Sequence, residues 1–192
     1  MLSTVPRINL ITEKSQIPAD QHAEYDRIVE ILHRVGGPFG VLMYSPGLAQ
    51  KVCEAGAWVR LNSTLTPVQR ELAILAVARE KDAAYEWASH VRTGRQQGLR
   101  EEAIEAVRNR GDVSQLEPDE RDIITFVRQL LQTNRVDQTL FDELVRRHDE
   151  RWLVELAATV GQYQYISAIN NAFDLQPAAD ADPLPIAVQS RR

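Results

Sequence analysis

The chain has 192 residues, a formal net charge of -5 and 44% hydrophobic residues. A chain of this size buries roughly 70% of its unfolded surface on folding, so we expect a single domain over residues 1–192. The negative charge argues against nucleic acid as a partner.

The sequence also limits the compartment and the redox chemistry. No apolar run reaches the roughly 20 residues that a membrane-spanning helix needs, and residues 1–16 lack the apolar core of a secretion signal. We therefore expect a cytoplasmic protein with no membrane partner. Cys53 is the only cysteine, which excludes an intrachain disulfide, a two-cysteine redox site and a cysteine-rich metal site.

The first part of the chain predicts an extended arm followed by two helices. Residues 1–17 carry little helical signal, and helical spacing of apolar residues begins near Asp20 and stops at Gly36-Gly37-Pro38. A short apolar stretch over residues 38–45 follows. Ser45 and Pro46 then begin a helix that we expect to run to about Leu61.

The next stretch, residues 66–98, predicts two helices joined by a short turn. Thr66, Pro67 and Gln69 form a helix start, with threonine as the cap and glutamine three residues later. Glu71 lies beside apolar positions of this helix, so we expect it to be partly buried. Burial would raise the pKa of its carboxyl group unless a cation or a donor holds the charge.

The second helix of this pair is expected to begin near Asp82 and to end near Gly98. Glu86 and His90 are four residues apart, so they lie one above the other on one face. Gly94 is the next residue on that face. A glycine there leaves room beside the imidazole for another chain segment or a ligand.

Four further helices are expected: a short one after Gly98, one beginning at Pro118, one capped by Asp137 and an apolar one from about Glu150 to Phe173. No segment alternates apolar and polar residues as a half-buried strand does. The predicted fold is therefore all-α, with about seven or eight helices. Its core covers about residues 20–176, and the tail 177–192 is expected to be irregular, either docked on a partner subunit or loose.

Three runs of this sequence, RELAILAVAR, YEWASH and GLREEAIEAV, resemble the carboxymuconolactone decarboxylase family, which shares its fold with alkylhydroperoxidase D. The resemblance covers about residues 20–176 and implies an alkylhydroperoxidase D-like helical bundle. In the redox branch of that superfamily, a glutamate precedes a CxxC pair and a histidine. Glu71 and His90 take the glutamate and histidine positions, whereas Ala83 and Glu86 stand where the cysteines would be. The chain thus resembles the cysteine-less branch, in which decarboxylation is the named activity.

The resemblance implies a lyase that removes CO2 from a small carboxylated lactone or ring-derived acid. An imidazole with a pKa near neutrality suits the proton transfer, so His90 is the expected acid or base. Glu71 is expected to orient it. Glu86 could carry a second proton or repel the substrate carboxylate, and the sequence leaves both roles open. Met43 and Tyr163 are expected to bind the substrate.

The resemblance also implies that the enzyme uses no metal or organic cofactor and forms a trimer or hexamer with sites near subunit interfaces. The spacing of Glu86 and His90 would permit a metal site, which the resemblance does not support.

Structural roles remain open for the same residues. Glu71 could bind the backbone or an arginine such as Arg70 or Arg79, and Tyr163 could be a core residue. Two other functions stay open as well: a non-catalytic oligomeric binding protein, and an alkylhydroperoxidase-like antioxidant that depends on Cys53.

Overall fold

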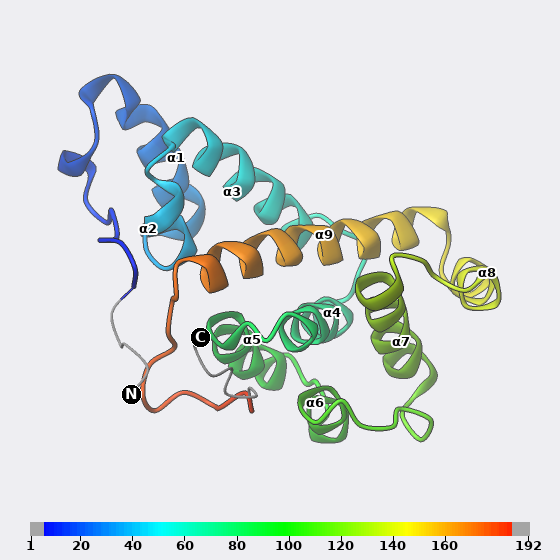
Figure 1. Cartoon of the computed structure of the whole chain (residues 1–192). Helices are drawn as coiled ribbons and strands as arrows, with labels where there is room; N and C mark the ends of the chain where they lie inside the picture. Colours follow the sequence, from blue (N-terminus) through cyan, green and yellow to red (C-terminus); the bar gives the residue numbers. More distant parts are fainter. Residues whose placement is uncertain (1–5, 186–192) are drawn as a thin grey trace.

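Helices make up all the regular secondary structure of residues 6–185, the part of the chain that the structure, a computed structural model, describes (Figure 1). This confirms the predicted all-α class. Nine α-helices form in these residues, one more than the upper expectation, because residues 38–42 fold into a short helix. The bounds are α1 (His22–Leu32), α2 (Pro38–Leu42), α3 (Pro46–Leu61), α4 (Pro67–Glu80), α5 (Ala84–Gln96), α6 (Glu101–Arg108), α7 (Pro118–Thr133), α8 (Gln138–Arg147) and α9 (Glu150–Ala172).

Two short 3-10 helices precede α1: Lys14–Gln16 lies within the predicted N-terminal arm, and Ala19–Gln21 follows it. Residues 1–5 of the arm lie outside the described residues.

The start of α4 follows its sequence signal. The hydroxyl of Thr66 accepts a hydrogen bond from the backbone N–H of Gln69, and the Gln69 side chain accepts one from the Thr66 N–H. Two backbone donors at the helix end are thereby satisfied, which is the purpose of this motif.

The start of α5 differs from the prediction. Asp82 does not cap the helix; it has a φ of 48° and forms the turn, and Ala83 occupies the N-cap position. A turn this short between two packed helices needs a left-handed residue, and aspartate adopts that conformation more readily than most residues. The helix ends at Gln96, and Gly98 follows with a φ of 90°.

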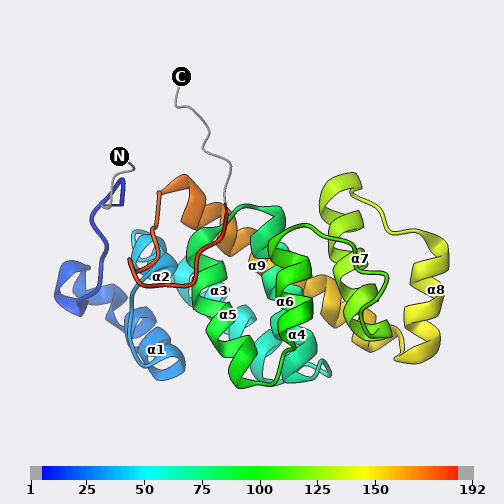
Figure 2. The same cartoon turned by 90° about the horizontal axis from the view of Figure 1, so that it is seen from below.

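Helix α4 lies at the centre of the molecule and packs against α5, α6, α7 and α9 (Figures 1 and 2). Every residue from Glu71 to Arg79 is buried, so the helix has no solvent face over this stretch. A helix surrounded on all sides normally carries only apolar residues. The glutamate at its start therefore stands out as a polar group inside the core.

Two hydrophobic clusters share the interior. The larger one surrounds α4, and the smaller one joins α1, α2 and α3 to the C-terminal half of α9. Helix α9 belongs to both, with Tyr163 in the larger cluster and Ile166 in the smaller one. The candidate site lies at this junction. The single-domain organisation inferred from the chain length stays a prediction.

The first residues of the tail are irregular, as expected, but they dock on their own chain. Asp182 forms ion pairs with Arg95 of α5 and Arg108 of α6, at 2.6 Å in each case. Leu184 is buried in the larger cluster. The expectation that the tail is loose is therefore wrong for residues 177–185, whereas its docking on a partner subunit stays a prediction. Residues 186–192 lie outside the described part.

None of the helices in residues 6–185 combines the length and the hydropathy that a membrane span requires.

Candidate functional site

The helical hairpin of α4 and α5 brings the three predicted catalytic residues together. His90 Nδ1 lies 2.8 Å from Glu71 Oε2, and His90 Nε2 lies 3.4 Å from Glu86 Oε2. Both glutamates are almost completely buried, with 3% and 4% of their surface exposed. The imidazole is therefore held between two carboxylates, one from each helix.

This arrangement keeps His90 charged. Burial favours the neutral imidazole, but the hydrogen bonds and charges of Glu71 and Glu86 outweigh it and raise the pKa of His90 to about 9. The sequence predicted a pKa near neutrality, and the structure corrects this upward. At neutral pH the side chain is an imidazolium, with both ring nitrogens acting as donors.

Two further side chains support the carboxylates. Asn170 of α9 donates a hydrogen bond from Nδ2 to Glu86 Oε1 at 2.8 Å, and both residues are buried. Arg70 Nε lies 3.9 Å from Glu71 Oε1, as one structural reading of Glu71 anticipated, whereas Arg79 pairs with Asp82. A buried carboxylate keeps its charge only with such donors and cations nearby.

His90 and Glu86 face a cavity of about 200 Å³. An apolar cavity of similar size in another protein holds benzene, so this one has room for a small substituted ring. Tyr163 lines it and meets the His90 ring edge-on, with ring centroids 5.0 Å apart and an interplanar angle of 88°. The lining combines polar and apolar side chains: Leu32, Pro38, Phe39, Cys53, Gly56, Arg60, Glu86, Ser89, His90, Gln162, Tyr163 and Ile166.

Not all expected residues reach the cavity. Met43 is 1% exposed, packs in the smaller cluster and is absent from the cavity lining. The room beside Gly94 is filled by the chain itself, because a Cβ at this position would lie 3.1 Å from Leu99 Cδ2. Glu71 lies behind the imidazole and does not line the cavity.

Sequence reasoning did not identify Arg60 or Asn170 as residues of the site. Arg60 lies on α3 and Asn170 on α9, and each meets the α4–α5 hairpin only through the tertiary fold. For Asn170 the sequence held one signal: it follows Ile166 by one turn, on the face of the helix that packs inward.

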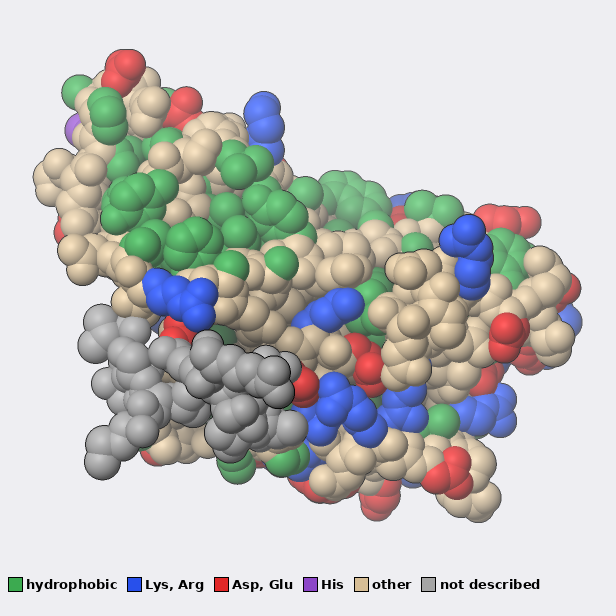
Figure 3. Space-filling model, viewed as in Figure 1, with side chains coloured by type: hydrophobic (Ala, Val, Ile, Leu, Met, Phe, Trp, Pro, Cys, Tyr) green, Lys and Arg blue, Asp and Glu red, His purple; other side chains and the backbone are tan. Residues whose placement is uncertain are grey.

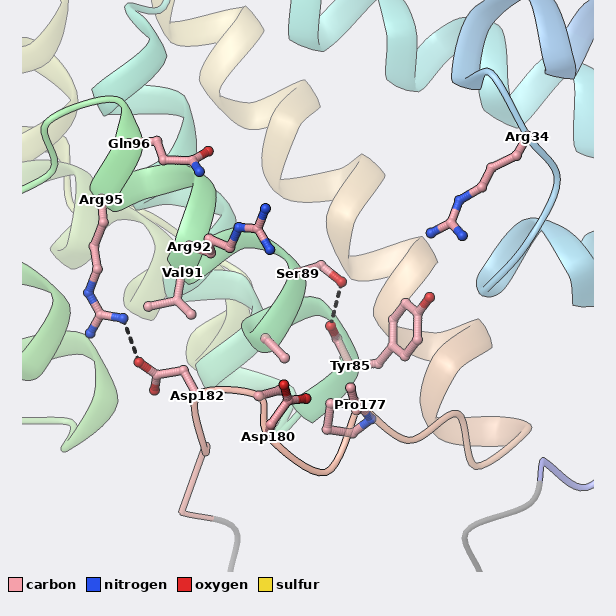
Figure 4. Close-up of a pocket in the computed structure, with 13 residues that line it drawn as sticks. Arg34, Tyr85, Ser89, Val91, Arg92, Arg95, Gln96, Pro177, Asp180 and Asp182 are labelled. Atoms are coloured by element: carbon pink, nitrogen blue, oxygen red, sulfur yellow. Dashed lines mark hydrogen bonds and ion pairs between the residues drawn. The ribbon is translucent and has the colours of Figure 1, made fainter.

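A larger and more open groove of about 700 Å³ runs beside the cavity, between α5 and the tail (Figure 4). Arg34, Tyr85 and Arg92 point toward it, and the ion pair of Arg95 with Asp182 lies at its end. Ser89 lines both hollows, so the groove and the cavity are neighbours on the same helix.

In residues 6–185, no group of three or more histidine, cysteine, aspartate or glutamate side chains is arranged to hold a metal ion.

The chain is similar to known proteins in sequence and in fold. Residues 46–129, which contain Glu71, Glu86 and His90, match the model of the carboxymuconolactone decarboxylase family. The fold is that of an alkylhydroperoxidase AhpD core, an uncharacterized peroxidase-related protein from Ralstonia eutropha JMP134, with a TM-score of 0.72 and 16% identity over 93% of this chain and 95% of that one. The match to the family model thus covers the α3 to α7 part of the chain, and the solved structure shows the same fold.

Two other solved structures have the same fold. An uncharacterized peroxidase-related protein from Silicibacter sp. TM1040 matches with a TM-score of 0.69 and 15% identity, covering 93% of this chain and 92% of that chain. The debrominase Bmp8 in complex with 2,3,4-tribromopyrrole matches with a TM-score of 0.68 and 17% identity, covering 91% and 95%. None of the curated protein sequences matches the chain.

The two positions that the sequence resemblance assigned to cysteines carry no thiol. Ala83 is fully buried at the N-cap of α5, and Glu86 is buried in its first turn. Cys53 lines the cavity from α3, but burial raises the pKa of its thiol to about 11. The thiolate is the reactive form of cysteine, so little of Cys53 is reactive at neutral pH.

Proposed function

We propose that the chain is a cofactor-independent lyase that decarboxylates a small carboxylated lactone or ring-derived acid. His90 supplies the proton, and Glu71 and Glu86 hold the His90 side chain in place. The non-catalytic binding protein remains the alternative that the first experiment must separate from this proposal.

The observation that supports the proposal is an imidazolium at the wall of a small cavity. An acid can act only if it carries a proton at the working pH and reaches the reacting atom. A pKa of about 9 meets the first condition. The second condition, access to the reacting atom, is met at Nε2. Glu71 holds Nδ1, whereas Nε2 makes only a longer contact of 3.4 Å with Glu86, and Glu86 itself lines the cavity.

The chemistry then balances without a further reactant. The bond between the substrate carbon and its carboxyl carbon breaks, CO2 leaves, and the electron pair passes into a conjugated carbonyl to give a dienolate. His90 donates its Nε2 proton to a carbon of the dienolate and regains a proton from water. One proton is consumed for each CO2 released, and no electron is exchanged with a cofactor.

The size of the cavity also favours a small ring. The debrominase with this fold is in complex with 2,3,4-tribromopyrrole, itself a small ring compound. That likeness concerns the fold, and the substrate assignment rests on the cavity and its side chains.

The test is CO2 release from carboxymuconolactone by the wild type and by His90→Gln. We expect release by the wild type and a loss of about 100- to 10,000-fold in the variant, the usual contribution of an acid–base group. His33→Asn is the matched control, because His33 is exposed and has a φ of 65°, which asparagine tolerates. Thermal unfolding of both variants checks that they fold.

Two outcomes contradict the proposal. If the wild type releases no CO2, the assigned substrate is wrong. If turnover is unchanged in His90→Gln, the assignment of His90 as the acid is wrong. Ligand binding without turnover would favour the non-catalytic binding protein.

The trimer or hexamer stays a prediction. Exposed apolar residues on α3 and α9, among them Trp58, Leu61 and Val154, offer surface that an oligomer would cover.

A further inference from the structure

Arg60 gives the cavity a cationic side that the proposed reaction has not used. It is half-buried on α3 and lines the cavity. Within residues 6–185 no carboxylate lies within ion-pair distance, and its one hydrogen bond runs from Nε to the carbonyl oxygen of Gly56 at 3.4 Å. A guanidinium has five N–H donors, so the two terminal nitrogens keep their donors available.

Most other arginines of the described chain are neutralised. Arg100 forms two hydrogen bonds with the Glu120 carboxylate, and Arg147 pairs with Asp119 and Asp122. Arg79, equally close to the core, pairs with Asp82. A half-buried arginine without a carboxylate is costly unless a ligand supplies the missing anion.

The charge of Arg60 acts inside the cavity. Burial raises the pKa values of Tyr163 and Cys53, and the positive charge of Arg60 opposes this rise at both side chains. Tyr163 and Cys53 both line the cavity, so the guanidinium lies near its interior rather than in open solvent.

The rest of the lining carries carboxylate, imidazole and apolar side chains. Glu86 and His90 come from α5 and Arg60 comes from α3, and the apolar part of the lining includes Leu32, Pro38, Phe39 and Ile166. A ligand that combines an anionic oxygen with a small apolar ring would match this combination of a cation, apolar side chains and an acid.

We propose that Arg60 binds a carboxylate of the substrate that the reaction retains, and thereby determines which acids the site accepts. This deepens the proposed function and rests on it for the reaction, but not for the binding of an acid. Arg60 is assigned to the carboxylate that stays on the product. An ion pair between arginine and the departing carboxylate would stabilise the negative charge that decarboxylation must disperse. The carboxylate that leaves is therefore placed away from Arg60.

The test measures binding apart from turnover. Nuclear magnetic resonance titrations of the ¹⁵N-labelled protein compare 2-furoate, a small ring acid, with its neutral analogue 2-furamide. We expect about millimolar binding of 2-furoate by the wild type, with shifts at cavity residues, and weaker binding of 2-furamide. Arg60→Gln should weaken 2-furoate binding by about tenfold to a hundredfold and leave 2-furamide unchanged.

Two variants sharpen the comparison. Arg60→Lys keeps the positive charge but cannot form bidentate hydrogen bonds with a carboxylate, so its affinity for 2-furoate should lie between those of the wild type and Arg60→Gln. Arg135→Gln removes the same charge at an exposed position whose Nη1 donates to the carbonyl oxygen of Asn134, and it should bind 2-furoate like the wild type.

The proposal is overturned if the wild type does not prefer 2-furoate over 2-furamide, or if Arg60→Gln binds 2-furoate as tightly as the wild type. The binding result and the CO2 assay can fail separately. Charge-dependent binding without CO2 release would keep Arg60 as the acid-binding residue and reject decarboxylation. CO2 release with an unchanged KM in Arg60→Gln would keep decarboxylation and reject the role of Arg60.

Discussion

The protonation of His90 is the residue-scale property on which the proposed reaction depends. Its pKa is raised to about 9 because the two carboxylates outweigh burial, so the acid form persists throughout the neutral range. A group whose pKa is raised loses its proton only as the pH passes the raised value. The rate of CO2 release should therefore stay level across neutral pH and fall above about pH 9.

Replacing Glu71 by glutamine should move that fall to lower pH. Glu71 touches the imidazole but not the cavity, so it acts as a positioning residue. Removing its charge should lower the pKa of His90 by about one to three units, the usual effect of one neighbouring opposite charge. The pH dependence of the rate measures this directly. An unchanged profile in Glu71→Gln, with normal thermal unfolding, would contradict the assigned role.

The sequence could predict this cluster because its contacts are local. Glu86 and His90 are one helical turn apart, and Glu71 lies on the preceding helix of the same hairpin. Arg60 and Asn170 could not be predicted, since their place at the site depends on how α3 and α9 pack against that hairpin. The raised pKa was missed for the same reason: it depends on distances and burial that spacing does not supply.

At the scale of helices, one buried hydrogen bond ties α9 to α5. Asn170 is 1% exposed, and its Nδ2 donates to Glu86 Oε1 at 2.8 Å. Asn170→Ala would leave that oxygen buried without this donor. We expect a loss of about 1–3 kcal/mol in the free energy of unfolding, measured by urea denaturation.

The neighbouring asparagine is the matched control for this change. Asn171 is exposed, and its Nδ2 donates to the carbonyl oxygen of Lys81, a group that water can reach in its place. Asn171→Ala should therefore cost less than Asn170→Ala. Equal losses in the two variants would mean that the contact with Glu86 adds nothing to the packing of α9.

Helix boundaries were predictable where the chain supplies its own cap. Thr66 and Gln69 fix the start of α4, and Glu117 with Pro118 fixes that of α7. Prediction failed at Asp82, where the packing of α4 on α5 sets the turn. It also failed for the short α2, which has too few residues for a periodic pattern.

At the scale of the whole molecule, the site lies where two cores meet. Exposed apolar side chains gather on one part of the surface, and Figure 3 shows hydrophobic side chains over the region of α1 to α3. Tyr44 and Leu48, at 60% and 46% exposure, belong to this part of the chain. The predicted oligomer would have to cover such a surface, and α3 carries part of it together with the cavity-lining Arg60.

The docked tail is the other feature that involves the whole chain, and Asp182 should hold it in place. Its carboxylate pairs with Arg95 and Arg108, whose hydrogen bonds hold its pKa below the usual range although burial opposes this. Asp182→Asn removes both ion pairs while keeping the size of the side chain. We expect amide hydrogen exchange in residues 176–185 to become roughly 5- to 30-fold faster, corresponding to about 1–2 kcal/mol of local stability.

The same substitution two residues earlier separates the ion pairs from a general effect of charge. Asp180 is exposed and forms no ion pair within the described residues, so Asp180→Asn should leave exchange unchanged. Added salt should reduce the difference between the variants, because it screens partly exposed pairs. Equal exchange in both variants would mean that other contacts are sufficient to dock the tail. These are the packing of Leu184 and the hydrogen bonds that the Arg79 and Arg108 side chains donate to backbone carbonyl oxygens of the tail. Faster exchange in Asp182→Asn alone would show that the wall of the groove beside the cavity depends on a single carboxylate.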